Sequence, residues 1–168
     1  LLLYKAQVQP HMEYCSYLWS GAPQYQLLPL DSIQRRAVRI VGDPELTDGL
    51  EPLSLRRDVG SLCMFYRLYN GECSEELFDL VPSSRFYHRT SSQRSKVHPH
   101  FLDTWHTKNK RACRSFLPRT CRMWNDLPPD VFPLRYDMGY FKKRVFRVLK
   151  SRQRLSDSCD VAYVHGRR

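Results

Sequence analysis

The stretch LLPLDSIQRRAVRIV, residues 27–41, gives the clearest structural signal in the chain, because it carries an apolar stripe and a basic stripe at helical spacing. Its apolar residues recur every three or four positions and would share one face of a helix: Leu30, Ile33, Ala37 and Val41. Three cations lie off that face: Arg35, Arg36 and Arg39. The stretch is interpreted either as a packing helix with a solvated basic edge or as a helix that holds a polyanion.

Residues near both ends of this stretch predict where the helix begins and ends. Pro29 is tolerated in a first turn, and Asp31 places negative charge at the positive end of the helix dipole. Gly42 and Pro44 supply a stop signal. The helix is therefore expected to lie within residues 27–41.

A second amphipathic helix is predicted from Leu55 to Tyr69, between a candidate N-cap at Ser54 and a stop at Gly71. Its apolar residues form one stripe: Leu55, Val59, Leu62, Tyr66 and Tyr69. Neither this stripe nor that of residues 27–41 is stable in water. The two helices are therefore expected to pack against each other.

Shorter helical segments are predicted on either side of this pair. Residues 1–20 form an amphipathic segment interrupted at Pro10, with Trp19 expected as a core anchor. A later helix is predicted to begin at Pro118 and to stop before Pro128. Residues 72–82 are expected to hold a short helical turn.

The last predicted helix, Asp137 to Leu149, also separates an apolar stripe from a basic one. Asp137 is its candidate N-cap. The apolar residues are Met138, Phe141, Val145, Val148 and Leu149. The opposite face carries Lys142, Lys143, Arg144, Arg147 and Lys150. The polar tail that follows, residues 151–168, is predicted to be disordered.

Residues 83–110 show no sustained period and are predicted to form an irregular basic loop. Cations gather in and just after this loop: Arg85, Arg89, Arg94, Lys96, Lys108, Lys110 and Arg111. Short extended pieces near Phe86, near Val97 and over residues 111–116 stay open. The fold class that follows is mainly α, a helical bundle with a long basic loop, a basic C-terminal helix and little or no β structure.

Composition favours an acidic partner. The 168 residues include 27 Lys and Arg against 17 Asp and Glu, a formal charge of +10, and a phosphate backbone is the simplest polyanion to match it.

No run reaches the roughly 18 apolar residues of a membrane span, and no signal peptide is recognisable, so an intracellular protein without a membrane partner is expected. Its six scattered cysteines are interpreted as reduced thiols. The chain opens inside an apolar pattern without Met, as expected of a piece of a longer polypeptide.

Residues that would support catalysis are sparse. The one adjacent carboxylate pair, Glu75-Glu76, lies beside turn residues, and the seven glycines are too scattered for a phosphate-binding loop. A set of four residues could be arranged as zinc ligands, although its spacing matches no familiar pairing: His98, His100, His106 and Cys113. We therefore expect no catalytic residues, no metal and no cofactor.

Several passages, taken in order, resemble one family. These are LLLYKAQVQPHMEYCSYLWSGAP, LDSIQRRAVRIVGDP, LRRDVGSLCMFYRLYNGECSEEL, FLPRTCRMWNDLPPDVF and YDMGYFKKRVFRVL, which together cover most of residues 1–154. They resemble the region downstream of the polymerase palm in reverse transcriptases of non-LTR (LINE-type, jockey-like) retrotransposons. The most specific parts are the Pro10 to Trp19 segment, the IQRRAVR helix and the passage from WNDLP to FKKR.

The resemblance implies a binding part of a transposable element's RNA-directed DNA polymerase. By this resemblance, residues 1 to about 70 would match the helical thumb and residues 111–150 the segment that follows it. The chain as a whole is expected to divide into a thumb-like helical region (1–82), a basic irregular loop (83–110), a C-terminal helical segment (111–150) and a disordered tail (151–168). The family's palm aspartates, its endonuclease residues and its cysteine-histidine knuckle are absent, so the chain is expected not to be an enzyme by itself. Its partners would be an RNA–DNA hybrid or duplex, bound without sequence preference, and the upstream palm. A functional copy would reach the nucleus.

Two other functions remain open from the sequence. The chain could be a protein-interaction or structural module whose apolar start packs on the missing palm, with no role in binding nucleic acid. It could also be a metal-dependent nuclease, although no ligand set supports that. The residues expected to contact phosphates under the first interpretation are the three arginines of the stretch 27–41 and the five cations of the last helix.

Overall fold

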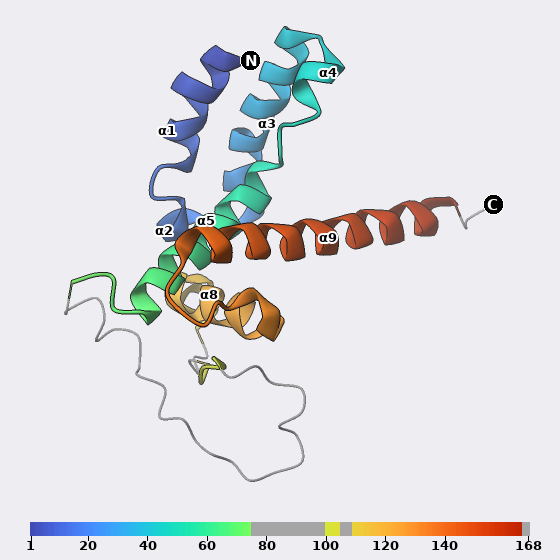
Figure 1. Cartoon of the computed structure of the whole chain (residues 1–168). Helices are drawn as coiled ribbons and strands as arrows, with labels where there is room; N and C mark the ends of the chain where they lie inside the picture. Colours follow the sequence, from blue (N-terminus) through green and yellow to red (C-terminus); the bar gives the residue numbers. More distant parts are fainter. Residues whose placement is uncertain (75–99, 105–108, 166–168) are drawn as a thin grey trace.

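The computed structural model describes residues 1–74, 100–104 and 109–165, and helices dominate it (Figure 1). The elements are, in order, η1 (Tyr4–Val8), α1 (Gln9–Glu13), α2 (Ser16–Trp19), α3 (Gln24–Val41), α4 (Pro44–Thr47), α5 (Leu53–Tyr69), α7 (Lys110–Arg114), α8 (Phe116–Asn125), η3 (Pro129–Val131) and α9 (Met138–His165). None of the described residues lies in a β-strand. The prediction of a mainly α fold is confirmed.

Helix α5 is the centre of this arrangement, because α9, α8 and α2 all pack against it. It runs antiparallel to α9. At one end the main-chain N–H of Asp137 donates to the hydroxyl of Tyr66 at 3.2 Å, and at the other the ammonium of Lys150 pairs with the carboxylate of Glu51. The apolar stripe predicted for α5 therefore lies against α8 and α9.

The largest fully buried side chains of the core are aromatic. The rings of Tyr66 and Phe141 stack with their centroids 4.1 Å apart, and Phe65 lies 5.2 Å from Trp124. Trp124, Phe65 and Phe141 are fully buried. The indole N–H of Trp124 also donates to the carbonyl of His100 at 2.7 Å, so its one polar atom is satisfied inside the core.

Helix α3 is not the partner of α5 that its apolar stripe predicted. Leu27 is its one buried residue, whereas the side chains of Ile33 and Ile40 are 42% and 76% exposed. Ala37 packs against a small cluster at the start of α5 that includes Leu53 and Tyr4. The larger aromatic residues of α8 and α9 cover the rest of α5, so the predicted pairing is wrong over most of the length of α3.

Polar contacts hold α3 in place instead. The guanidinium of Arg57, which is almost fully buried, donates to Asp31 at 3.1 Å, and the side-chain amide of Gln34 donates to the carbonyl of Glu51 at 3.0 Å. The helix begins at Gln24, earlier than predicted, so Pro29 lies inside it. A helical periodicity alone could not indicate these anchors, because they are polar residues on the edge of the stripe.

Helix α9 is longer than predicted. Its N-cap is confirmed, since the Asp137 carboxylate accepts from the N–H of Tyr140 at 2.8 Å, but the helix continues to His165 where residues 151–168 were predicted to be disordered. The sequence from Ser151 to His165 contains no Gly or Pro, and Gly166 follows it. Because no helix breaker interrupts these residues, the helix continues through them.

Three local predictions have different outcomes. Residues 110–114, which were open to an extended piece, form α7, with the side chain of Asn109 capping it through the N–H of Arg111 at 2.9 Å. Trp19 is only partly buried and lies beside a surface pocket. Other predictions fall wholly or mostly outside the described residues, because they concern residues 75–99 and 105–108. They include the helical turn over residues 72–82 and the strands near Phe86 and Val97.

The N-terminal helices are fastened to α5 by a pH-sensitive ion pair between Arg56 and Glu13. Burial alone would raise the pKa of Glu13, but hydrogen bonds from Arg56 and Gln9 and nearby positive charge hold it below its ordinary 4.5. The stability from this pair is present above that ordinary pKa and is lost as the pH falls through the lowered value.

We expect Glu13→Gln to reduce the free energy of unfolding at neutral pH by about 1 kcal/mol or less, because the pair is partly exposed. The loss should shrink as the pH falls below about 4.5. Thermal melting across that range measures it. Glu45→Gln is the control, since Glu45 is exposed and has no ion pair in the described part of the chain. A loss that is equally large in acid would show that the Glu13 charge is not responsible.

Candidate nucleic-acid interface

The cations of α9 do not all point into solvent. Lys142, Lys143 and Arg147 are exposed. Arg144 is partly covered, because its guanidinium lies 3.6 Å from the carboxylate of Asp130 and 5.2 Å from the centre of the Tyr140 ring. Three of the five predicted phosphate contacts on this helix are therefore unpaired within the described residues.

Lys150, the fifth, has a structural role. Its ammonium pairs with Glu51 and lies 5.6 Å from the centre of the Phe146 ring, so it fastens α9 to the segment before α5. Glu51 also accepts from Gln34 of α3 through its carbonyl. Glu51 is thus a point at which α3 and α9 are both attached, although no contact joins their exposed cations.

Lys142 lies toward the other end of the α5–α9 contact, near the N-terminal helices. Its charge lowers the pKa of Glu13, together with the larger effect of Arg56. It also lies close to Cys63, where burial raises the pKa of the thiol to about 11 and Lys142 partly offsets the rise. The Cys63 thiol therefore stays protonated at neutral pH.

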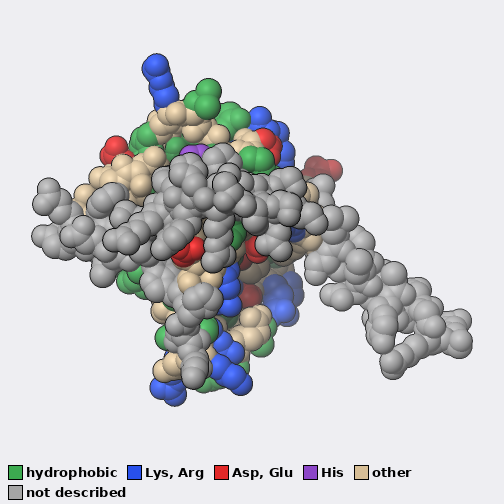
Figure 2. Space-filling view, turned by 90° about the horizontal axis from the view of Figure 1, so that it is seen from below, with side chains coloured by type: hydrophobic (Ala, Val, Ile, Leu, Met, Phe, Trp, Pro, Cys, Tyr) green, Lys and Arg blue, Asp and Glu red, His purple; other side chains and the backbone are tan. Residues whose placement is uncertain are grey.

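The three arginines of α3 are all exposed. Two of them, Arg35 and Arg39, line a shallow hollow of about 500 Å³ with Ser32, Gln34 and Val38, whereas Arg36 lies outside it. Seen from below, Lys and Arg side chains are visible at several places on the surface (Figure 2). The structure therefore supplies two basic helix faces, one on α3 and one on α9.

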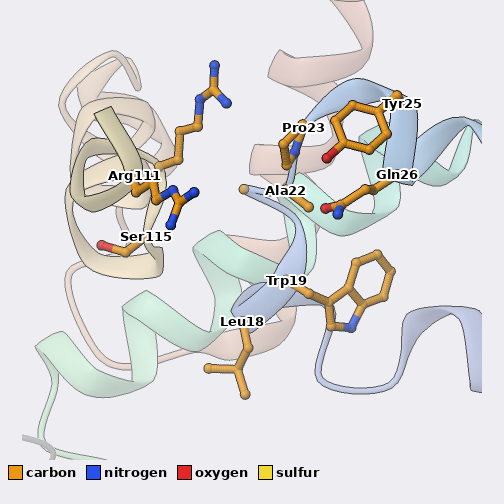
Figure 3. Close-up of a pocket in the computed structure, with 10 residues that line it drawn as sticks. Leu18, Trp19, Ala22, Pro23, Tyr25, Gln26, Arg111 and Ser115 are labelled. Atoms are coloured by element: carbon orange, nitrogen blue, oxygen red, sulfur yellow. The ribbon is translucent and has the colours of Figure 1, made fainter. Parts of the chain in front are cut away.

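A pocket that the sequence did not predict lies between the α2–α3 corner and the α7–α8 corner (Figure 3). Its volume is about 450 Å³, and it is lined by Leu18, Trp19, Gly21, Ala22, Pro23, Tyr25, Gln26, Arg111, Arg114 and Ser115. The two corners are in close contact, since a Cβ added to Gly21 would lie 1.8 Å from the carbonyl oxygen of Arg114. The sequence signal was the isolated glycine in WSGAP, but nothing in the sequence indicated which backbone approaches it.

A polar junction around Arg119 joins three helices. The guanidinium of Arg119 in α8 donates to Asp58 in α5 at 3.3 Å, to the hydroxyl of Ser20 at 2.6 Å and to that of Ser61 at 2.9 Å. Burial raises the pKa of the Asp58 carboxyl above its ordinary value, although the charges of Arg119 and Arg57 partly offset the rise. The junction holds α2 and α8 on α5 and so fixes the two corners that form the pocket.

The candidate zinc ligands are not assembled in the described part of the chain. No group of three or more His, Cys, Asp or Glu residues there could hold a metal ion. His100 lies in the aromatic core, where its Nδ1 is 3.1 Å from the hydroxyl of Tyr69, and burial lowers its pKa. Cys113 lies in α7, and the other two candidates, His98 and His106, are outside the described residues.

No helix among the described residues is both long enough and apolar enough to cross a membrane. Comparison of the chain with family models, curated proteins and solved structures found no match of any kind. The resemblance to reverse transcriptases of non-LTR retrotransposons stays a prediction from the sequence.

Proposed function

We propose that this chain is a non-catalytic C-terminal part of a non-LTR retrotransposon reverse transcriptase that grips primer-template nucleic acid through basic helix faces. The proposal rests on three exposed cations of α9, a helix whose other face packs into the core. They are Lys142, Lys143 and Arg147. A helix fixed in this way presents its cations on a rigid frame, and such cations contact phosphates without reading sequence.

The exposed arginines of α3 would extend the same contact. Arg35, Arg36 and Arg39 have no ion pair in the described residues, so their charge is available to a polyanion. The α3 and α9 faces would contact different parts of a backbone or two strands of one duplex. A working copy would also need access to the nucleus, where target-primed copying takes place.

We expect the triple variant Lys142→Gln, Lys143→Gln and Arg147→Gln to weaken binding to an RNA–DNA hybrid and to flatten its salt dependence. Each phosphate contact contributes roughly 0.9 to the slope of log K against log salt, so three lost contacts should reduce the slope by about two to three. Fluorescence anisotropy with a labelled hybrid at several salt concentrations measures this. Arg144 and Lys150 are left unchanged because their ion pairs support the fold.

The matched control removes the same charge elsewhere, with Lys5→Gln, Arg67→Gln and Arg135→Gln, three exposed cations that lie outside both helix faces. If the control flattens the salt dependence as much as the α9 variant does, net charge explains the binding and the helix face does not. Binding by the unchanged chain that does not vary with salt would exclude phosphate contacts altogether.

A second candidate function is a helical module that packs on the missing polymerase palm. The observation in its favour is the apolar surface of the N-terminal segment and α3, where Leu2 and Leu3 are 84% and 75% exposed. Such surface favours protein contacts. It predicts that the chain alone self-associates, and sedimentation measures this. A monomer that binds the hybrid would favour the first proposal over this one.

A further inference from the structure

The pocket between the two corners combines aromatic and basic side chains that neither proposed function uses. Figure 3 shows Pro23, Tyr25 and Gln26 on one side of it and Arg111 and Ser115 on the other. Its volume of about 450 Å³ falls within the roughly 300–1,000 Å³ of small-ligand sites. The pocket is therefore large enough for one nucleotide.

Its aromatic side offers a ring for stacking. The side chain of Tyr25 is 71% exposed. Trp19 is partly covered, and its orientation is fixed because the indole N–H donates to the carbonyl of Tyr14 at 3.0 Å, while the guanidinium of Arg57 lies 5.9 Å from the ring centre. The exposed ring of Tyr25 is suited to an unpaired base, since every nucleobase has a face that can stack on an aromatic side chain.

The basic side of the pocket is not neutralised. Arg111 and Arg114 are exposed and have no ion pair within the described part of the chain, and no acidic side chain lines the pocket. The hydroxyl of Ser115 donates to the carbonyl of Ala112 at 2.7 Å, so its oxygen can still accept, and Gln26 offers both a donor and an acceptor. Two unpaired guanidinium groups across the pocket from an exposed ring match a nucleotide, in which the sugar joins the phosphate to the base.

We propose that this pocket binds one unpaired nucleotide of a single-stranded nucleic acid, with the base against Tyr25 and the phosphate at Arg111 and Arg114. The inference deepens the proposed nucleic-acid function, but it uses residues other than the α9 and α3 cations. An acidic peptide would engage the two arginines and leave the exposed ring unused. A base with its phosphate uses both sides of the pocket.

The test is binding of the whole chain to a labelled single-stranded oligouridylate and to oligothymidylate, measured beside a blunt RNA–DNA hybrid. We expect Tyr25→Ala to weaken single-strand binding about tenfold, a typical effect of removing one stacking ring. The matched control is Tyr14→Ala, because Tyr14 is 76% exposed and lies outside the pocket lining. The Trp19 bond to residue 14 uses its backbone, so the control leaves that bond in place. The two oligonucleotides differ in the 2′-hydroxyl of the sugar and in the 5-methyl group of the base, so equal binding would show that the pocket requires neither.

The basic side is tested with Arg111→Gln combined with Arg114→Gln, against Arg67→Gln combined with Arg135→Gln, which removes the same charge at other exposed positions. The pocket variant should reduce the single-strand salt slope by about 0.7, because the slope counts phosphates and both arginines contact one phosphate, and the control should not. Melting temperatures equal to that of the unchanged chain confirm that each variant folds.

The outcomes separate this inference from the proposed function. If Tyr25→Ala weakens single-strand binding and the α9 variant leaves hybrid binding unchanged, the pocket proposal holds and the α9 proposal fails. If Tyr25→Ala binds single strands as tightly as Tyr14→Ala does, the pocket proposal is overturned whatever the hybrid shows. Binding of oligoglutamate that depends on Arg111 and Arg114 but not on Tyr25 would also overturn it, in favour of an acidic peptide.

Discussion

Replacing Trp124 with alanine is expected to lower the free energy of unfolding by about 3–5 kcal/mol, the usual cost of removing a buried large aromatic side chain. The residue is fully buried, and its ring contacts several others in the core, including Phe65, Phe132 and Phe141. The variant also leaves the carbonyl of His100 without its indole donor. Since a small domain has only about 5–15 kcal/mol of stability, this loss would remove a large share of it. Urea titration followed by circular dichroism measures the change.

Trp19→Ala is the natural control, because it deletes the same side chain at a partly exposed position. It should cost clearly less than Trp124→Ala. Trp124→Phe gives a second comparison, since it keeps an aromatic ring in the core and loses the hydrogen bond to His100. Equal losses for Trp19→Ala and Trp124→Ala would mean that the core does not centre on the contact of α8 with α5 and α9.

The sequence predicted the helices better than their partners. The stripes of α5 and α9 were identified correctly, and Phe141 and Val145 are fully buried as expected. Periodicity indicates which face of a helix avoids water, but it does not identify the element that covers that face. The stripe of α3 illustrates this limit, since Ile33 is exposed while the polar residue Asp31 makes the anchoring contact with Arg57.

The candidate site was predictable in part for a similar reason. The exposure of Lys142, Lys143 and Arg147 follows from their place opposite the α9 stripe. The ion pair of Lys150 could not be inferred, because its partner Glu51 lies 99 positions away in the chain. The pocket required two corners to meet, Trp19 to Gln26 and Arg111 to Ser115, and no local pattern relates segments so far apart.

Replacing Gly21 with alanine is expected to separate these two corners. The added Cβ would lie 1.8 Å from the carbonyl oxygen and 2.9 Å from the carbonyl carbon of Arg114, and neither backbone atom can move without shifting the end of α7. Forcing extra volume into a closely packed position costs about 1–3 kcal/mol, and more where backbone must shift. We therefore expect a lower free energy of unfolding and, because Arg114 would move away from Tyr25, weaker binding of single strands.

The chain provides a matched control in Gly49→Ala, since nothing lies within 4 Å of a Cβ added at Gly49. That variant should unfold and bind as the unchanged chain does. Urea titration and oligouridylate binding, measured on both variants, test stability and pocket geometry together. If Gly21→Ala is as stable as Gly49→Ala, the close approach of Gly21 to Arg114 is wrong, and the pocket lined by both corners cannot have the shape described. If Gly21→Ala is less stable than the unchanged chain but binds single strands normally, the contact between the two corners contributes to stability only. The base and phosphate then do not bind between the corners.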